Sequence, residues 1–232
     1  MNLFDALNPS AYRYERKFYI THLALLELEH LIHHHPALFS EIFYERQVNN
    51  IYFDSVALRS YFDNLAGISQ RYKARIRWYG DTFGIARTPT LEIKLKNNAL
   101  GQKLRYNLPD LPIGPHLSHF DWQRAIIAAG VPAHLRDDLL GLRPVFANSY
   151  RRKYFQSADR RFRLTIDRDL KYYRVSSAWG VSPVAHQLGS GLVMELKYSP
   201  EADELADRIT AWFPFRVTKN SKYIHGVETL YA

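Results

Sequence analysis

The stretch Gln70–Tyr79, which reads QRYKARIRWY, decides the fold of this 232-residue chain. Successive side chains of a β-strand point to opposite faces, so a strand here would sort its residues into two chemically distinct sets. One face would carry the four cations Arg71, Lys73, Arg75 and Arg77. The other face would carry Tyr72, Ala74, Ile76 and Trp78. The pattern predicts a strand with an apolar face on a core and a basic face opposite.

The same alternation recurs along the chain. LEIKLK, residues 91–96, places Glu92, Lys94 and Lys96 opposite three aliphatic side chains. Further charged faces contain Lys103 and Arg105; Arg161, Arg163, Thr165 and Asp167; Glu195 and Lys197; and Arg13, Glu15 and Lys17. Any one of these faces is best explained as the solvent side of an ordinary sheet. The repetition of mostly cationic faces on several strands argues against solvent exposure of all of them, because solvent faces normally mix both signs of charge.

Repeating like charges on one strand face is costly. Two such charges lie about 6–7 Å apart, which costs roughly 2–3 kcal/mol per pair at an effective dielectric near 20. A bound polyanion would offset that cost. Closing the strands into a barrel would direct the charges inward and leave the apolar faces for helices. We therefore expect residues 1–232 to form one α+β domain, an antiparallel β-barrel tunnel with surrounding helices.

Hydrophobic periodicity predicts the remaining elements. The expected strands are Arg13–Ile20, Val48–Phe53, Gln70–Tyr79, Thr90–Lys96, Lys103–Leu108, Val145–Phe155, Arg161–Asp167, Leu170–Val175 and Gly191–Tyr198. The expected helices are Thr21–His33, Phe120–Ala129, Ala133–Leu140, Glu201–Trp212 and Lys219–Leu230. LPDLPIGP, residues 108–115, is rich in proline and glycine and is interpreted as a loop.

Composition narrows the class of protein. The net charge is +8 and the sequence pI is about 9.6, which indicates a polyanionic partner. Because the chain has no cysteine, disulfides, thiolate metal sites and cysteine nucleophiles are excluded. The start of the chain lacks the basic and apolar pattern of a signal peptide, and we see no membrane segment. We expect a cytoplasmic protein.

The carboxylates among the cations need a separate explanation. Glu195, in VMELKY, faces the same way as Lys197. Such a carboxylate could share Mg²⁺ or Mn²⁺ with phosphate oxygens, or it could only pair with an arginine. Asp167 is expected to pair with Arg163 or to have a turn role beside Arg168, with a second metal ligand as the alternative. Glu15 and Glu92 are expected to be partners that fix Lys17 and Lys94, with metal ligation again as the alternative.

Taken in order, seven motifs resemble the VTC domain, the catalytic domain of vacuolar transporter chaperone polyphosphate polymerases. They are YRYERKFYI, ARIRWYG, LEIKLKN, SYRRKYF, FRLTID, VMELKY and TKNSKYIHG, between Arg13 and Gly226. That family lies within the CYTH-like triphosphate tunnel metalloenzymes. The resemblance implies a tunnel that binds ATP, triphosphate or inorganic polyphosphate, with a divalent metal (Mn²⁺ or Mg²⁺) as cofactor. It also implies transfer of the γ-phosphoryl group of ATP to a polyphosphate chain.

The resemblance assigns roles by position. The catalytic cations would be Lys17, Arg75, Arg77, Lys94, Arg152, Arg163 and Lys222. Substrate-binding roles would fall to Lys197, to Ser221 beside Lys222, and to the basic residue after Lys94, which is Lys103 or Arg105. Glu195 matches the metal ligand.

One departure separates the chain from the hydrolytic members of the superfamily. Those members open with Glu-x-Glu-x-Lys, whereas Arg13 stands here in place of the first Glu. This favours the VTC branch over a tunnel triphosphatase. The alternatives are that phosphohydrolase and a non-catalytic module that binds polyphosphate or another phosphorylated ligand. A nucleic-acid-binding barrel ranks last, because the aromatic residues alternate onto the face opposite the cations.

Overall fold

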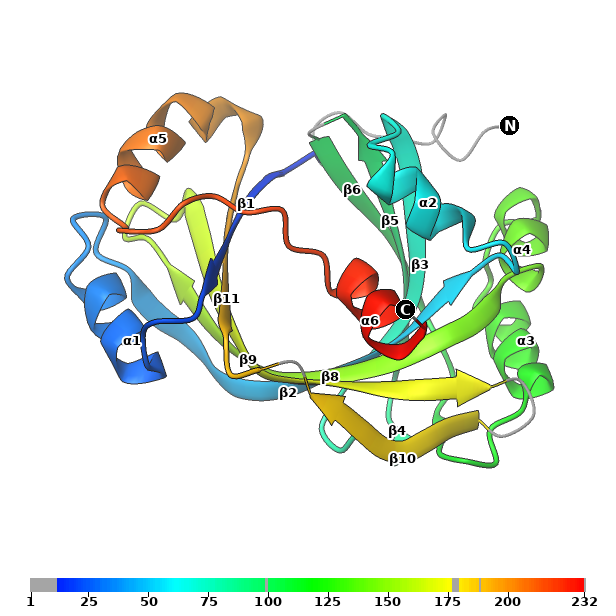
Figure 1. The fold of residues 1–232 in the computed structure, drawn as a ribbon. Helices are drawn as coiled ribbons and strands as arrows, with labels where there is room; N and C mark the ends of the chain where they lie inside the picture. Colours follow the sequence, from blue (N-terminus) through cyan, green and yellow to red (C-terminus); the bar gives the residue numbers. More distant parts are fainter. Residues whose placement is uncertain (1–11, 99, 177–179, 188, 232) are drawn as a thin grey trace.

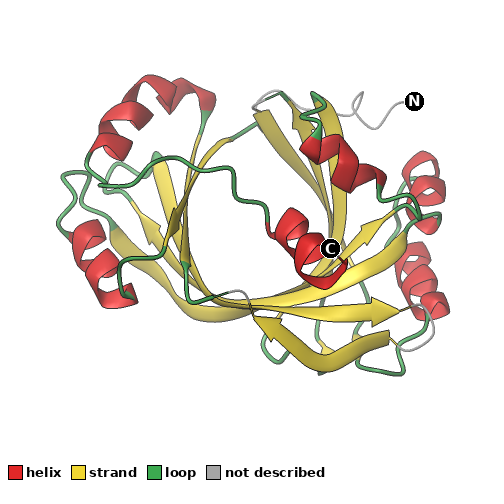
Figure 2. Cartoon of the chain, viewed as in Figure 1, coloured by secondary structure: helices red, strands yellow, loops and turns green. Residues whose placement is uncertain are grey.

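The computed structural model describes residues 12–98, 100–176, 180–187 and 189–231 as an α+β protein built on a large antiparallel sheet (Figures 1 and 2). The strands of that sheet are β1 (Tyr14–Ile20), β2 (Ser40–Asp54), β3 (Gln70–Tyr79), β5 (Thr90–Asn97), β6 (Leu100–Asn107), β8 (Arg143–Gln156), β9 (Phe162–Ser176), β10 (Gly180–Gln187) and β11 (Leu192–Tyr198). Two short strands, β4 (Gly84–Ala86) and β7 (Leu111–Ile113), form a separate ribbon.

The strand order of the large sheet is β1-β11-β9-β8-β2-β3-β5-β6, with β10 added to β9. The sheet curves so strongly that its two edge strands approach each other (Figure 1). They meet at one antiparallel bridge, in which the Arg13 and Gly101 backbones exchange hydrogen bonds of 3.1 and 3.3 Å. The edges are therefore joined at this point instead of along a continuous ladder.

Helices cover the convex side of the sheet at both ends. On one side, α1 (Leu25–His33) and α5 (Asp203–Ala211) bury Leu28, Ile32 and Ala206 against Phe18, Leu164 and Met194. On the other, α3 (His119–Ala128) and α4 (Ala133–Leu140) pack Trp122, Ile126 and Leu135 on Ala74, Ile76 and Trp78. The apolar face of QRYKARIRWY is thus on the outside of the curve, against helices, and its basic face points inward.

The C-terminal helix α6 (Lys222–Tyr231) lies on the concave side instead, together with the nearby α2 (Arg59–Leu65) at its rim (Figure 1). Its buried residues Tyr223, Val227 and Leu230 pack on Phe146 and Tyr172 of the sheet. The segment between α5 and α6 crosses in front of the concave space, and Thr218 N–H donates to the Lys17 carbonyl at 2.7 Å. Helix α6 therefore occupies part of the enclosed space and delivers its N-terminus to the rest.

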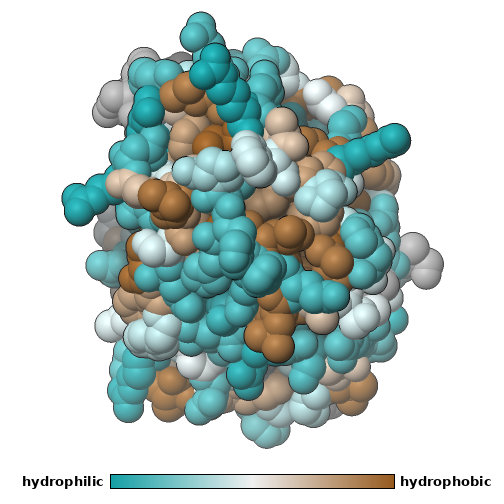
Figure 3. Space-filling model, turned by 90° about the vertical axis from the view of Figure 1, so that its left-hand side faces the viewer, coloured by the Kyte–Doolittle hydropathy of each residue, from teal (hydrophilic) through white to brown (hydrophobic). Residues whose placement is uncertain are grey.

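The surface around α1 and α5 is chemically mixed. Figure 3 shows hydrophilic groups separating smaller hydrophobic patches on this face. No helix in the described part of the chain is both long enough and apolar enough to cross a bilayer.

The predicted fold class is confirmed, and the element boundaries differ in several places. The helix expected from Thr21 begins at Leu25. The two strands expected between Arg161 and Val175 are one long strand, β9. The stretch read as a loop contains β7, while α2 and β10 were not predicted. Strand β2 begins at Ser40, eight residues before its expected start, because its first half pairs with β8 even though its side chains are largely exposed.

Candidate functional site

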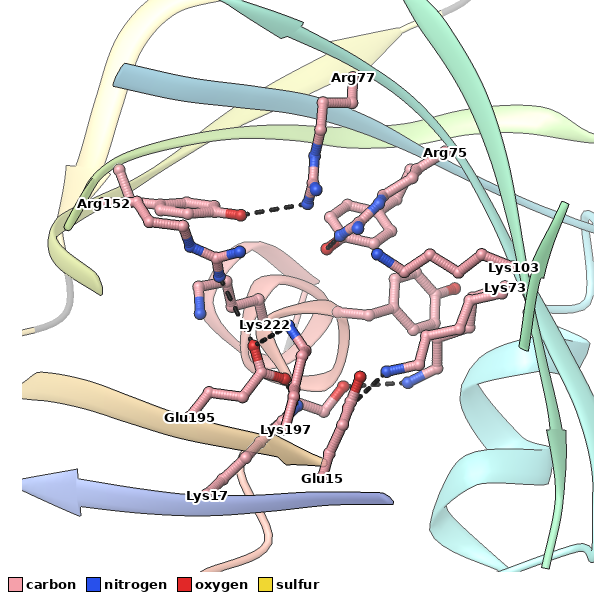
Figure 4. Close-up of a pocket in the computed structure, with 15 residues that line it drawn as sticks. Glu15, Lys17, Lys73, Arg75, Arg77, Lys103, Arg152, Glu195, Lys197 and Lys222 are labelled. Carbon is pink, nitrogen blue, oxygen red and sulfur yellow. Dashed lines mark hydrogen bonds and ion pairs between the residues drawn. The ribbon is translucent and has the colours of Figure 1, made fainter. Parts of the chain in front are cut away.

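A cavity on the concave side of the sheet gathers most of the inward-facing cations (Figure 4). Its lining includes nine basic side chains: Lys17, Lys73, Arg75, Arg77, Lys94, Lys103, Arg152, Lys197 and Lys222. The other lining residues are Glu15, Glu195, Ser221 and the tyrosines Tyr52, Tyr150 and Tyr223. These side chains come from β1, β2, β3, β5, β6, β8, β11 and the start of α6. Strand alternation and closure of the sheet together produce the cavity.

Strand β3 places two arginines on the cavity wall. Arg75 Nε lies 2.8 Å from Glu92 Oε2, and its Nη1 donates to the Tyr52 hydroxyl at 3.1 Å. Arg77 donates through Nε to Asn50 Oδ1 at 2.9 Å and through Nη2 to the Tyr150 hydroxyl at 3.2 Å. Side-chain partners on β2, β5 and β8 thus hold both guanidinium groups in place, which suits planar recognition of phosphate oxygens.

A second group of charges joins β8, β9 and α6. Arg152 makes a two-pronged contact with Asp167, with Nη2 2.7 Å from Oδ2. Lys222 Nζ lies 2.5 Å from the same Oδ2. Asp167 is 2% exposed, and its pKa falls to about 2 because Arg152 and Lys222 outweigh the effect of burial, which alone would raise it. The ionised Asp167 therefore fixes two cations that face the cavity.

Strands β1 and β11 contribute the carboxylates of the lining. In the register of this strand pair, Lys17 lies opposite Glu195 and Glu15 lies opposite Lys197. Lys197 Nζ is 2.8 Å from Glu195 Oε2, and Lys94 Nζ is 2.6 Å from Glu15 Oε2. Burial alone would raise the pKa of both carboxyl groups, yet Lys197 and Lys17 hold the pKa of Glu195 well below its usual range. Lys94 lowers the pKa of Glu15 to about 2, so both groups are ionised at neutral pH.

The N-terminus of α6 completes the site. Ser221 immediately precedes the helix, and its Oγ accepts a hydrogen bond from Lys73 Nζ at 3.0 Å. The neighbouring Asn220 carbonyl accepts one from Lys17 Nζ at 2.9 Å. A helix N-terminus with a hydroxyl and a lysine beside it is a favourable place for an anionic oxygen. The helix expected over Lys219–Leu230 is present and begins three residues later, at Lys222.

The cavity carries a formal excess of positive charge. Four carboxylates, Glu15, Glu92, Asp167 and Glu195, form ion pairs with eight of the nine lining basic side chains, all except Lys73, so the formal charges leave an excess of five. Burial, together with repulsion from Lys17 and Lys94, lowers the pKa of Lys73 to about 6. Burial also lowers the pKa of Lys94 to about 8, although Glu15 opposes that change. These shifts are those expected of a site built to hold additional negative charge.

The residues present fit a hard divalent cation. Glu195 and Glu15 are ionised, come from adjacent strands and line the same cavity. Mg²⁺ and Mn²⁺ sites of this kind use one or two carboxylates and complete their coordination with water and substrate phosphates. No cluster of three or more potential metal-ligating side chains occurs among the residues that the structure describes. Glu195 and Glu15 would therefore hold such an ion only together with a phosphate ligand.

The structure brings together most of the predicted site residues, with two exceptions. Arg163 is exposed and is not part of the cavity lining, and the side chain of Arg105 is 65% exposed, although its Nε lies 3.3 Å from Glu92. Of the two candidates after Lys94, Lys103 lines the cavity. Two expected pairings are also wrong: Asp167 binds Arg152 and Lys222 instead of Arg163, and Glu92 binds Arg75 instead of fixing Lys17 or Lys94.

Several lining residues were not among the predicted site residues. Lys73 shares the inward face of β3 with Arg75, and the same alternation that identified Arg75 could have identified it. Tyr150 lies two positions before Arg152 on β8, so its inward direction could also be read from the sequence. The expectation that aromatic residues lie only on the outer face is wrong for Tyr52, Tyr150 and Tyr223.

Comparison with known proteins shows that this fold occurs in other solved structures. A candidate adenylate cyclase from Vibrio parahaemolyticus has the same fold, with a TM-score of 0.52 and 12% identity over 91% of this chain and 97% of that one. Two further solved structures are similar at a lower level. They are a candidate adenylate cyclase from Bacillus halodurans (TM-score 0.49, 14% identity, 96% and 100% coverage) and a protein from Pyrococcus horikoshii (0.49, 12%, 93% and 99%).

Residues 12–231 match the VTC domain, and the chain therefore belongs to the VTC domain family. No curated protein sequence matches it.

Proposed function

We propose that this VTC domain binds the triphosphate of ATP in its basic cavity and transfers the γ-phosphoryl group to a polyphosphate chain. One observation carries the proposal: nine basic side chains from seven strands and helices face one cavity with only four carboxylates to balance them. A ligand with closely spaced negative charges matches this distribution better than a single phosphate does. Bidentate arginines and lysine point charges are the groups that recognise such a ligand.

The path of a longer phosphate chain is suggested by the register of β3 and β5. Arg71 lies directly opposite Lys96, and Lys73 lies directly opposite Lys94, so both are cation–cation pairs. The next pair along the two strands, Arg75–Glu92, is neutral. Like charges directly opposite on a sheet are destabilising unless something offsets them. These four cations also line a second cavity of about 640 Å³, and Lys73 and Lys94 line the first cavity as well, as do Glu15, Lys17 and Ser221. This row of cations supports a chain that extends beyond the space needed by one triphosphate.

The proposed step is an in-line displacement at the γ-phosphorus. A terminal phosphate oxygen of the chain forms a new P–O bond, while the bond between the γ-phosphorus and the β,γ-bridging oxygen breaks. The electron pair of that bond leaves with ADP. Such transfer needs positioning and charge stabilisation more than a protein nucleophile. Arg75, Arg77 and Arg152 would orient the phosphates, and Lys222 would neutralise charge beside Asp167.

Glu195 and Glu15 would hold the Mn²⁺ or Mg²⁺ that the fold family implies. Bound there, the ion would neutralise part of the charge on the phosphate oxygens.

An assay with purified protein, ATP, Mn²⁺ and a short polyphosphate primer tests the proposal, with gel analysis of chain length. Longer chains with matching ADP release are expected from the wild type. We expect Arg75→Ala to abolish synthesis, and Arg124→Ala, a change to an exposed α3 arginine that pairs with Asp121, to retain it. Phosphate release without longer chains would identify a hydrolase. Tight binding with no turnover would identify a binding module.

A further inference from the structure

A cluster of aromatic rings surrounds Arg46 beyond the cavity lining. The Arg46 guanidinium carbon lies 4.1 Å from the ring centroid of Phe43, 4.3 Å from that of Tyr79 and 4.7 Å from that of Tyr154. In the described part of the chain, no ion pair joins Arg46 to a carboxylate, and its Nε has no hydrogen-bond partner. The guanidinium is thus held by ring faces, unlike the carboxylate-bound arginines of the cavity.

Strand register places this cluster on the inner face of the sheet. Arg46 lies directly opposite Arg152, which lines the cavity, and directly opposed residues of an antiparallel pair point to the same face. Tyr154 follows Arg152 by two positions, and Tyr79 follows Arg77 by two positions, so both also face inward. The cluster is therefore the next layer of the inner face after Arg77 and Arg152.

The same cluster reaches solvent. Tyr79 is 47% exposed and Phe43 is 40% exposed. An inner-face side chain can be exposed only where the enclosed space ends, so the cluster marks one rim of the barrel. The opposite end of β3 carries Arg71, in the cation–cation pairs described above. The two ends of the inner face therefore differ in chemistry: one is aromatic and the other is a row of cations.

We infer that the rim formed by Phe43, Arg46, Tyr79 and Tyr154 is the subsite for the nucleobase of the nucleoside triphosphate. Exposed aromatic rings and an arginine plane are the groups on which bases stack. Tyr79 and Arg75 are four residues apart, about 13 Å along a strand, a span that an extended nucleoside triphosphate can cover. The inference rests on the proposed function. It fixes the direction of the substrate, with the base at the aromatic rim and the γ-phosphate toward the row of cations.

Binding measurements with two ligands test the inference. The β,γ-imido analogue of ATP contains a base, whereas tripolyphosphate does not, and calorimetry gives the Kd of each. Tyr79→Ala should weaken binding of the analogue about tenfold or more and change the Kd of tripolyphosphate by less than about twofold. Tyr79→Phe should retain the wild-type preference, because the ring remains. Trp212→Ala, which removes an exposed aromatic side chain near the end of α5, should change neither Kd.

The outcomes separate this inference from the function on which it rests. Equal losses for both ligands in Tyr79→Ala, or no loss for either, would overturn the base subsite without contradicting phosphate binding by the wild-type cavity. Failure of the wild type to bind either ligand would overturn the base subsite together with the proposed function. Because Tyr79 is half exposed at the end of its strand, the variant should fold, and its thermal unfolding curve checks this.

Discussion

Lys73 and Arg75 are neighbours on the inner face of β3, yet their charges are balanced differently. Arg75 is bound to Glu92, and this interaction raises the pKa of the guanidinium against the opposing effect of burial. Lys73 faces Lys94 across the ladder and donates to the neutral hydroxyl of Ser221. No carboxylate lies within ion-pair distance of Lys73 in the parts of the chain that the structure describes. At the residue scale, a buried lysine without a counter-ion is the clearest sign of a missing anion.

Replacing Lys73 should therefore separate stability from binding. Lys73→Met removes a desolvated amine and its repulsion from Lys17 and Lys94, so it should raise stability by about 1 kcal/mol or more. That corresponds to a Tm increase of about 2–4 °C. The same change should weaken tripolyphosphate binding about tenfold. Thermal unfolding and calorimetry measure the two effects. The exposed Lys171→Met is the control and should alter neither by much. A less stable Lys73→Met protein with unchanged affinity would contradict this account.

The lowered pKa of Lys73 also predicts proton uptake. With a pKa of about 6, the amine is mostly neutral at pH 7.5 in the free protein. A bound polyanion raises that pKa, so binding at pH 7.5 should take up protons, and affinity should fall as the pH rises above 6. Calorimetry in buffers of different ionisation enthalpy measures the uptake. Proton release on binding would have the wrong sign for this mechanism.

In the free protein, the lowered pKa of Lys73 makes stability rise with pH, whereas a lysine whose pKa is raised by an ion pair makes stability fall with pH. The unfolded chain has a lysine pKa near 10.4, above the folded value of about 6, so it binds more protons between these limits. The contribution of Lys73 to stability therefore rises with pH across that window, and saturating tripolyphosphate should reduce the slope.

At the scale of elements, α6 decides the shape of the cavity. Gly226 lies against Phe146, and a Cβ there would be 2.3 Å from the ring atom Cζ. Tyr223 also donates a hydrogen bond to Asp54, which accepts the backbone N–H groups of Ser60 and Tyr61 at the start of α2. Close packing on the sheet and this shared carboxylate hold α6 so that Ser221 and Lys222 face the cavity.

Gly226→Ala should displace α6. The added methyl group overpacks the contact with Phe146 and should cost about 1–3 kcal/mol. Because the N-terminus of α6 would move with the helix, tripolyphosphate affinity should fall as well. Gly141→Ala is a matched control: its Cβ would meet the Asp138 carbonyl oxygen at an ordinary 3.5 Å, so stability should change little. Equal effects of the two substitutions would argue against a fixed position for α6.

At the scale of the whole molecule, the alternation of charge repeated on several strands, together with the helical patterns, predicted an α+β fold with cations directed inward. Alternation gives the face of a strand but not the position of a residue along the barrel. For that reason Arg163 was expected in the site, although it is exposed and not part of the cavity lining. The apolar spacing of Tyr223, Val227 and Leu230 predicted a helix, but not that it would cover the concave face. Short elements such as α2 carry too few residues for a periodic signal.

The convergence of cations on one cavity is the central claim, and a crystal structure with tripolyphosphate and Mn²⁺ tests it most directly. We expect the anion to contact Arg75, Arg77 and Arg152, with the anomalous signal of manganese beside Glu195. An anion bound instead on the outer surface, with Lys73 and Lys222 left without phosphate contacts, would contradict the account.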